Sequence, residues 1–210
     1  MIRLVIADDH ALIRRGLSEL VGETSDIRLV AEAASGDEVL RLLREERVDV
    51  LVTDMNMPGA SGLDLVKSLR AEHPSLAILV LSAHPEDQYA VRVVRAGASG
   101  YLTKESAEAD LLDAVRRVAS GKRFLSQALA ASILDALDVN SHEEPHAALS
   151  DREYQVLRLI ASGQTVGGIA DELALSVKTV STYRTRMLQK MGMSNNAEAT
   201  RYALENGLID

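Results

Sequence analysis

Acidic, hydroxyl and basic side chains end short apolar runs in the first half of the chain. Asp8 and Asp9 directly follow one such run and Asp54 follows another, while Ser82 and Lys104 come at the ends of two more. If these runs are parallel strands of one sheet, their carboxyl ends share an edge, and the five side chains converge there. The spacing therefore predicts a single site assembled from distant parts of the sequence.

The residue types in this set favour phosphoryl chemistry. Three crowded carboxylates repel one another unless a cation shares their charge, and a hard ion such as Mg²⁺ binds carboxylates, backbone carbonyls and water. Asp54 would then act as a nucleophile towards phosphorus. The Lys104 ammonium would neutralise the transferring oxygens, and Ser82 would offer them a hydroxyl. The pattern predicts Mg²⁺-dependent phosphorylation of Asp54.

A simpler explanation exists for each acid taken alone. A single Asp after a strand is usually a turn residue or a helix cap. Here, however, an acidic pair, a lone acid, a hydroxyl and a lysine follow strands one, three, four and five of one pattern, which disfavours coincidence. Adjacent side chains point in different directions, so we expect Asp9 to reach the metal most directly and Asp8 to be auxiliary.

Five apolar strands alternating with five amphipathic helices would position these residues. The strands are expected at Arg3–Ala7, Arg28–Ala33, Val48–Thr53, Ala77–Leu81 and Gly100–Thr103. The helices are expected at Leu12–Val21, Gly36–Glu46, Gly62–Glu72, Glu86–Ala96 and Ala107–Ser120. Strands that are apolar on both faces and separated by helices specify a parallel sheet covered on both sides. We therefore expect a flavodoxin-like, doubly wound α/β domain over residues 1–121.

The pattern changes after Gly121. A further helix is expected at Phe124–Leu137, and the polar stretch Asp138–Ala148 has no clear period, so residues 122–147 are predicted to be a linker helix and a polar linker. Residues 148–210 are predicted to be a small all-α domain of four helices. Ser150 and Glu153 have the spacing of a capping box, and Ser176 is the expected cap of the third helix. The four helices are expected at Asp151–Ser162, Val166–Leu173, Val177–Met191 and Ala197–Asn206.

The first part of the sequence resembles the receiver domains of two-component response regulators over roughly residues 1–120. The resemblance rests on the strings VIADDH, VTDMNMPGASG, LSAH and GYLTK. It implies that Asp54 accepts a phosphoryl group from a sensor histidine kinase, with Ser82 and Lys104 as the assisting hydroxyl and lysine. Lys104 is followed by Glu105, where the family commonly has proline. The implied Mg²⁺ ligands are Asp8, Asp9, Asp54 and the backbone carbonyl of Asn56.

Tyr101 matches the family's aromatic switch residue, which changes rotamer together with the hydroxyl residue Ser82 on activation. The alternative is that Tyr101 is a half-buried packing residue on an edge strand. Both interpretations stay open at this point.

The charge distribution bears on nucleic-acid binding. The chain has 31 acids and 23 lysines and arginines, but residues 145–210 contain 7 of each, so the net negative charge lies in the first part. Residues 173–197 contain four cations and no acid, namely Lys178, Arg184, Arg186 and Lys190. A locally cationic element on a neutral domain is compatible with phosphate contacts.

The C-terminal helices have the layout of a helix-turn-helix, in which the second helix enters the major groove. Val180, Met187 and Met191 are spaced to form its inward face. By pattern alone a solvated surface is the commoner explanation. The string LSDREYQVLRLIASGQTVGGIADELALSVKTVSTYRTRMLQKMGM, however, resembles the output domain of the LuxR/NarL/FixJ class, departing from it at Ser181 and Tyr183. The resemblance implies double-stranded DNA contacts from Lys178, Thr179, Ser181, Thr182, Arg184, Thr185 and Lys190.

The favoured hypothesis is a phosphorylation-dependent transcription regulator, not an enzyme, that binds DNA as a homodimer when phosphorylated, since paired half-sites multiply affinity. A Mg²⁺-dependent phosphohydrolase is one alternative, but its Asp-x-Asp pair after strand one is replaced by adjacent Asp8 and Asp9. A regulator controlled without phosphorylation is another, which the complete acidic site disfavours. The chain has no cysteine and no apolar stretch long enough for a bilayer, so we expect a cytoplasmic protein.

Overall fold

The computed structural model describes residues 1–210 except 56, 60–61, 84–87, 139–144, 174 and 210. It divides into two compact units, Met1–Ala136 and Leu137–Asp210, each described here by itself. The predicted domain boundaries after residues 121 and 147 stay predictions. Among the described residues, no helix combines the length and apolar character needed to cross a membrane.

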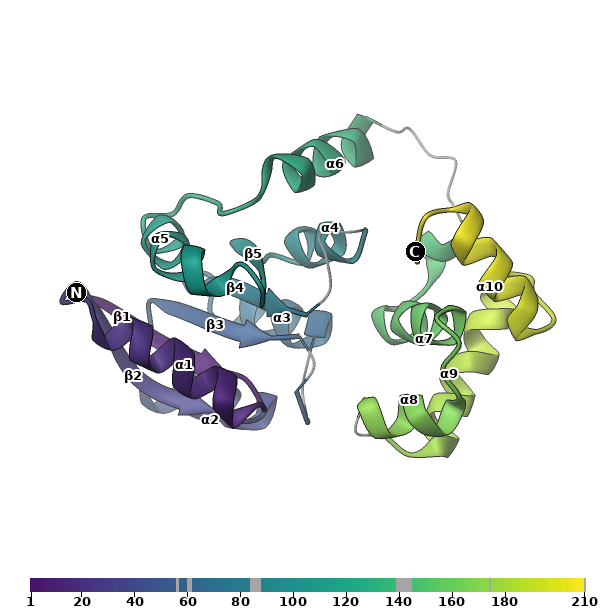
Figure 1. Ribbon diagram of the computed structural model, residues 1–210, viewed down its shortest axis with the longest axis horizontal. Coiled ribbons are helices and arrows are strands. Elements are labelled where there is room, and N and C mark those ends of the chain that lie inside the picture. The colour runs from purple at the N-terminus through teal and green to yellow at the C-terminus, as the bar shows by residue number, and fades with distance from the viewer. Residues whose placement is uncertain (56, 60–61, 84–87, 139–144, 174, 210) are drawn as a thin grey trace. The chain divides into compact units, whose positions relative to one another are not determined.

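The first unit is a five-stranded parallel sheet in the order β2-β1-β3-β4-β5 (Figure 1). The strands are β1 (Ile2–Ala7), β2 (Ile27–Ala33), β3 (Val50–Asp54), β4 (Ala77–Ser82) and β5 (Gly100–Thr103). Five helices alternate with them: α1 (Ala11–Gly22), α2 (Gly36–Glu45), α3 (Gly62–Glu72), α4 (Gln88–Arg95) and α5 (Ala107–Ala119). This is the doubly wound α/β fold that the alternating pattern predicts, and the prediction is confirmed.

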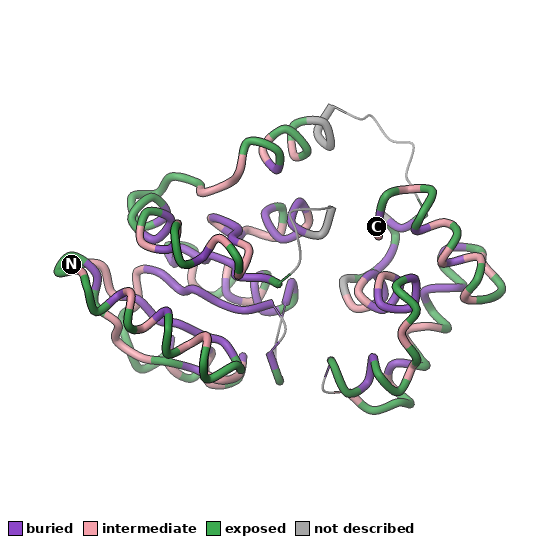
Figure 2. The backbone as a smooth tube through the Cα atoms, in the orientation of Figure 1, coloured by how far each residue is buried: buried purple, intermediate pink, exposed green. Residues whose placement is uncertain are grey.

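Burial on both faces explains why the central strands are apolar throughout. Every residue of β3 and β4 is buried (Figure 2). On one face, Leu17 of α1 and Leu111 of α5 pack with Val52 of β3 in a single core cluster. The neighbouring residue Leu51 points to the other face and is equally inaccessible. β1 and β3 are adjacent, and the strand order of the sheet changes direction at this pair. In sheets of this kind, ligands bind beside the carboxyl ends of the strands at such a point.

Two parts of the linker region differ from the predictions. The helix α6 spans Gln127–Asp138 and begins three residues later than expected. The reason is that Phe124 pairs with the edge strand: its amide donates to the Ser99 carbonyl, and its carbonyl accepts from the Tyr101 amide. Gly100 permits this approach, because a Cβ there would lie 2.8 Å from the Phe124 carbonyl oxygen.

The second difference is a 3₁₀ helix, η1 (Pro145–Ala148), within the stretch predicted to be a polar linker. His146 on η1 is 5% exposed, and its Nδ1 lies 2.8 Å from the Tyr202 hydroxyl. The side chains of Tyr154 and Tyr202 both make ring contacts with it. This part of the expected linker is therefore packed into the second unit.

Four helices follow, α7 (Asp151–Ala161), α8 (Val166–Glu172), α9 (Val177–Lys190) and α10 (Asn196–Glu205) (Figure 1). The predicted capping box is present, with Ser150 and Glu153 each bonded to the other's backbone amide, and the Ser176 hydroxyl caps α9. Helix α7 packs against α9 and α10, and α8 packs against α9. The predicted four-helix domain is confirmed.

Candidate functional site

The sheet brings the chemistry-bearing residues together as its topology requires. Asp8 follows β1 directly, Asp54 is the last residue of β3, Ser82 is the last residue of β4, and Lys104 follows β5. Asp54 pairs in register with Leu81, the residue before Ser82. The Lys104 amide donates a 2.7 Å hydrogen bond to the Ser82 carbonyl, which ties the ends of β4 and β5 together. The four residues therefore share one edge of the sheet.

Lys104 bridges the two buried carboxylates. Its Nζ lies 2.8 Å from Asp8 Oδ2 and 3.0 Å from Asp54 Oδ2, and its side chain is 16% exposed. Burial alone would lower the pKa of Lys104, but the hydrogen bonds and charges of Asp8 and Asp54 outweigh burial, so the pKa is raised. The ammonium therefore stays charged at neutral pH and offsets part of the repulsion between the carboxylates.

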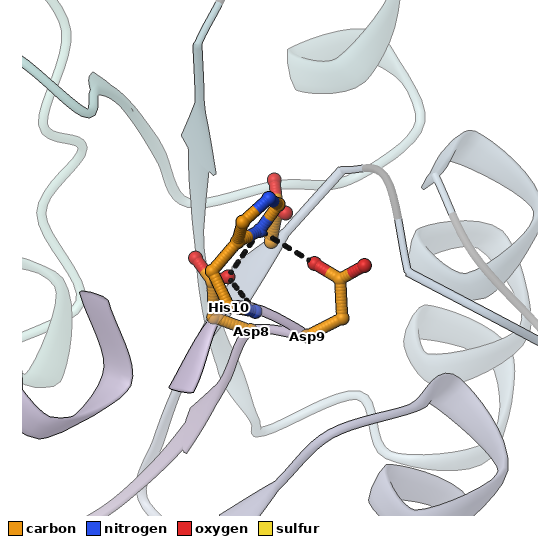
Figure 3. Close-up of side chains that lie close together, drawn as sticks. Asp8, Asp9 and His10 are labelled. Carbon is orange, nitrogen blue, oxygen red and sulfur yellow. Dashed lines mark hydrogen bonds and ion pairs between the residues drawn. The ribbon is translucent and has the colours of Figure 1, made fainter. Parts of the chain in front are cut away.

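Asp8 and Asp9 have different environments. The Asp8 side chain is fully buried, and its Oδ1 accepts a 2.8 Å hydrogen bond from the His10 amide. The Asp8 carbonyl accepts from Arg14 Nη1 at 2.6 Å. The Asp9 side chain is 32% exposed, with Oδ1 2.8 Å from His10 Nδ1 (Figure 3). Asp8 thus faces the bridging lysine and Asp9 the solvent-accessible side, and the expectation that Asp9 contacts the metal more directly stays a prediction.

The donor set fits a divalent cation. Asp8, Asp9, His10 and Asp54 each offer one ligand atom, and these atoms lie within 4.8 Å of one another. Asp8 Oδ2 is buried and lies 2.8 Å from Lys104 Nζ. Because the carboxylates of Asp8, Asp9 and Asp54 outnumber this one ammonium, the edge of the sheet keeps a net negative charge that attracts a further cation. Asn56, whose carbonyl is an expected ligand, lies outside the described residues.

His10 is the member of this cluster that the sequence reasoning missed. The signal was present, because His10 comes directly after the two acids in the string VIADDH. A histidine beside two carboxylates at a strand end is a potential metal ligand.

Ser82 and Tyr101 are enclosed in the first unit. Ser82 is fully buried, and Tyr101, which pairs in register with Val80 on β4, is 1% exposed. The half-buried packing role considered for Tyr101 therefore does not match its burial. The peptide bonds of the described residues include no cis bond, so the bond before Glu105 is trans.

In the second unit, α8 and α9 form the predicted helix-turn-helix. The Thr165 side chain caps α8, and the Leu175 amide donates to the Ala170 carbonyl across the turn that leads to α9. Val180 and Met187 on α9 are fully buried, as their spacing predicts. The opposite face of α9 is therefore directed away from the helical core.

That outer face carries the exposed polar residues. Lys178, Ser181, Thr182 and Thr185 are all exposed. The Thr182 hydroxyl donates to the Lys178 carbonyl and the Thr185 hydroxyl to the Ser181 carbonyl, so each keeps only acceptor capacity and a methyl group for a partner. Thr179 is half-buried, and its hydroxyl lies 2.7 Å from that of the cap Ser176.

Two cations of α9 have partners inside the unit. Arg184 Nε donates a 2.6 Å hydrogen bond to Asn196 Oδ1 of α10. Lys190 Nζ lies 2.6 Å from Glu153 Oε2, and Glu153 is 3% exposed. The sequence reasoning assigned Glu153 to the capping box alone and missed this ion pair.

Family models match both units of the chain. Residues 4–116 match the response regulator receiver domain, and residues 147–203 match the luxR family of bacterial regulatory proteins. The chain is 34% identical to the response regulator GacA of Pseudomonas aeruginosa, covering all of this chain and 99% of that protein. It is 35% identical to the response regulator UvrY of Escherichia coli, with 100% and 97% coverage.

Solved structures of RcsB are also similar over nearly the whole chain. One is RcsB from Salmonella enterica serovar Typhimurium bound to the promoter rprA in the presence of the phosphomimetic BeF₃⁻, with a TM-score of 0.64 and 26% identity over 96% of this chain and 97% of that one. Another contains two RcsB dimers bound to two parallel DNAs, with a TM-score of 0.60, 28% identity and the same coverage. With its receiver domain and its luxR-family helix-turn-helix domain, the chain belongs to the two-component response regulators.

Proposed function

We propose that Asp54 accepts a phosphoryl group from the phosphohistidine of a sensor histidine kinase, and that this modification controls DNA binding by the second unit. The observation that carries the proposal is the double ion pair of Lys104 with Asp8 and Asp54. Two buried carboxylates and an ammonium lie together at one edge of the sheet. This supports the proposal, because a carboxylate can act as the nucleophile and a cation can neutralise charge on the transferring phosphoryl group.

Asp54, Lys104 and Ser82 have different roles in the phosphoryl transfer. Lys104 holds one Asp54 oxygen and orients the carboxylate, and an Asp54 oxygen forms the new O–P bond as the P–N bond to the kinase histidine breaks. The electron pair of the broken bond returns to the imidazole. Lys104 then neutralises negative charge on the transferred group, and the Ser82 hydroxyl donates to one of its oxygens. Mg²⁺, held by Asp8, Asp9, Asp54 and the Asn56 carbonyl, would supply further charge neutralisation when bound.

Ser82 and Tyr101 form the proposed switch. A hydroxyl drawn towards the phosphoryl group vacates space at the end of β4, and the neighbouring aromatic residue on β5, which is buried, can then change its rotamer. The burial of both side chains supports this proposal, because a rotamer change in a closely packed interior displaces neighbouring groups. The rotamer change would therefore alter the surface of the first unit near β5.

We further propose that α9 lies in the major groove of double-stranded DNA. The exposed side chains Lys178, Ser181, Thr182 and Thr185 support this role, and Thr179, Arg184 and Lys190 were predicted to join them. The relative RcsB was solved on DNA and as dimers, which supports DNA and a second copy of this chain as partners. The protein then acts in the cytoplasm as a regulator and not as an enzyme with turnover of a separate substrate.

The test is incubation of the full chain with a small phosphodonor and Mg²⁺, followed by intact mass and DNA-binding measurements. A single added phosphoryl group on Asp54 and tighter DNA binding are expected. Rapid phosphate release without any effect on DNA would instead indicate a phosphohydrolase. DNA binding that is unaffected by the phosphodonor would indicate control without phosphorylation.

A further inference from the structure

His10 adds a nitrogen donor to the acidic cluster. Its Nδ1 lies 2.8 Å from Asp9 Oδ1 and 3.1 Å from Asp8 Oδ1, so the imidazole faces both carboxylates (Figure 3). With Asp54, the four ligand atoms lie within 4.8 Å of one another. The His10 side chain is 63% exposed, which lets a hydrated ion reach it without disturbing the core. The set is therefore a mixed oxygen and nitrogen site and not a purely acidic one.

The contacts of Nδ1 are better satisfied by a cation than by a proton. An ionised carboxylate only accepts hydrogen bonds, so Nδ1 must carry a hydrogen and share it between two oxygens. One hydrogen cannot be well aligned with both acceptors. A cation in its place attracts the nitrogen and both oxygens at once. Three carboxylates surround the site and outnumber the Lys104 ammonium that offsets them, so the site keeps a negative potential.

The spacing of the donors leaves them close enough to share one ion. Ligands on adjacent corners of an octahedron with bonds of about 2.1 Å are about 3.0 Å apart. His10 Nδ1 lies 2.8 and 3.1 Å from the two carboxylates, so only small movements would bring these atoms to such corners.

Octahedral ions differ in their affinity for imidazole. Mg²⁺ prefers oxygen ligands, whereas first-row transition ions accept imidazole and bind such sites more tightly along the series from Mn²⁺ to Ni²⁺. We propose that His10 Nδ1 is a direct ligand of the divalent ion in this cluster and makes the site select transition ions such as Mn²⁺ and Ni²⁺ over Mg²⁺. This proposal rests on the proposed function, since the ion is the one that serves phosphorylation of Asp54.

The test titrates the full chain with Mg²⁺, Mn²⁺ and Ni²⁺ separately by calorimetry. His10→Gln is expected to lower the Ni²⁺ affinity by about tenfold or more and the Mn²⁺ affinity by less, and to change the Mg²⁺ affinity by no more than about twofold. His73→Gln is the matched control, because His73 precedes β4 at the opposite end of the sheet. This control should leave all three affinities unchanged.

A spectroscopic measurement separates ligation from an indirect effect. Electron spin echo spectra of the Mn²⁺-loaded protein should show nitrogen coupling that is absent from His10→Gln, with circular dichroism used to check that the variant is folded. Equal losses for Mg²⁺ and Ni²⁺, unchanged Ni²⁺ affinity, or absent nitrogen coupling in the unmodified chain would each overturn the proposal. Failure of the proposed function is recognised independently, by a mass that does not increase after phosphodonor treatment in Mg²⁺.

Discussion

Lys190, the last residue of α9, is held 2.6 Å from the buried carboxylate of Glu153, which also accepts a hydrogen bond from the Ser150 amide at the start of α7. The end of the proposed recognition helix is thus fastened to the capping box of another helix. Lys190→Ala leaves the buried acid without its cation, which costs about 1–3 kcal/mol. We expect the second unit to unfold at lower denaturant concentration, as measured by hydrogen exchange of α7 in the full chain.

The Lys190 variant also has a defined effect on DNA binding. If Lys190 serves the ion pair alone, Lys190→Ala weakens DNA binding but leaves the salt dependence unchanged. Lys178→Ala is the comparison, because Lys178 is exposed and its loss should lower the salt slope by about one ion. A slope reduction of equal size for Lys190→Ala would show that Lys190 also contacts phosphate.

Glu153 should make the stability of the second unit depend on acid. Burial alone raises the pKa of Glu153, but the hydrogen bonds from Lys190 and Ser150 outweigh it and lower the pKa below the usual 4.5. A depressed carboxyl pKa contributes stability that is present above the unfolded value and lost as pH falls through the folded value. The hydrogen-exchange protection factors of α7, which are corrected for the intrinsic effect of pH on exchange, should therefore change little from neutrality to about pH 4.5 and fall below it. Glu153→Gln should remove this part of the acid dependence, and an unchanged profile would contradict the assignment.

Asp54→Asn should abolish modification by a small phosphodonor. The substitution is nearly isosteric and removes the nucleophilic oxygen, while Asp8 retains its contact with Lys104. Intact mass spectrometry measures the result, with Asp113→Asn, an exposed acid on α5, as the control that should still be modified. Stoichiometric phosphorylation of Asp54→Asn would identify a different acceptor.

Lys104→Met tests the balance of charge at the strand ends. Without the ammonium, Asp8 and Asp54 stay buried with their mutual repulsion, so the first unit should lose about 1–3 kcal/mol in the presence of chelator. Because an ion that binds only the folded protein stabilises it, Mg²⁺ should restore more stability to this variant than to the unmodified chain. Thermal melts with chelator and with millimolar Mg²⁺ measure the difference. An identical response to Mg²⁺ in both proteins would argue against a shared charge cluster.

The sequence predicted those features that depend on local patterns. The five strands and most helix ends follow from apolar periodicity and from caps such as Ser150 and Ser176, which act within four residues. Convergence of Asp8, Asp54 and Lys104 was predictable because the carboxyl ends of neighbouring parallel strands share one edge.

Contacts between residues that are far apart in the sequence, and that no periodic pattern connects, were not predictable. The sequence places His146 in a polar linker, but its side chain is buried, because its ring is hydrogen-bonded to Tyr202, 56 residues away. The sequence predicts that a helix begins at Phe124, but the backbone of Phe124 pairs with β5, because Gly100 leaves space for it. The Lys190–Glu153 ion pair spans 37 residues, and a lysine in a cationic segment gives no local sign of such a partner.

The last prediction concerns how α9 distinguishes DNA sequences. The Thr182 hydroxyl hydrogen is used by the Lys178 carbonyl, so this side chain can offer a base only an acceptor oxygen and a methyl group. If the methyl group packs against a thymine methyl, Thr182→Val should keep the base preference, whereas Thr182→Ala should lose about 1 kcal/mol or more of discrimination. Ser181→Ala should change preference at a different base, because its hydroxyl can donate.

These changes are measured with the full chain on specific and random duplexes at several salt concentrations. Thr182→Val and Thr182→Ala should leave the salt slope unchanged, because neither removes a charge, and Lys178→Ala should weaken both duplexes by similar factors. Equal weakening of specific and random DNA by all three variants would mean that the outer face of α9 contacts only the backbone. Sequence would then be read through the shape of the DNA or by other residues, because contacts to phosphate carry no direct information about the base pairs.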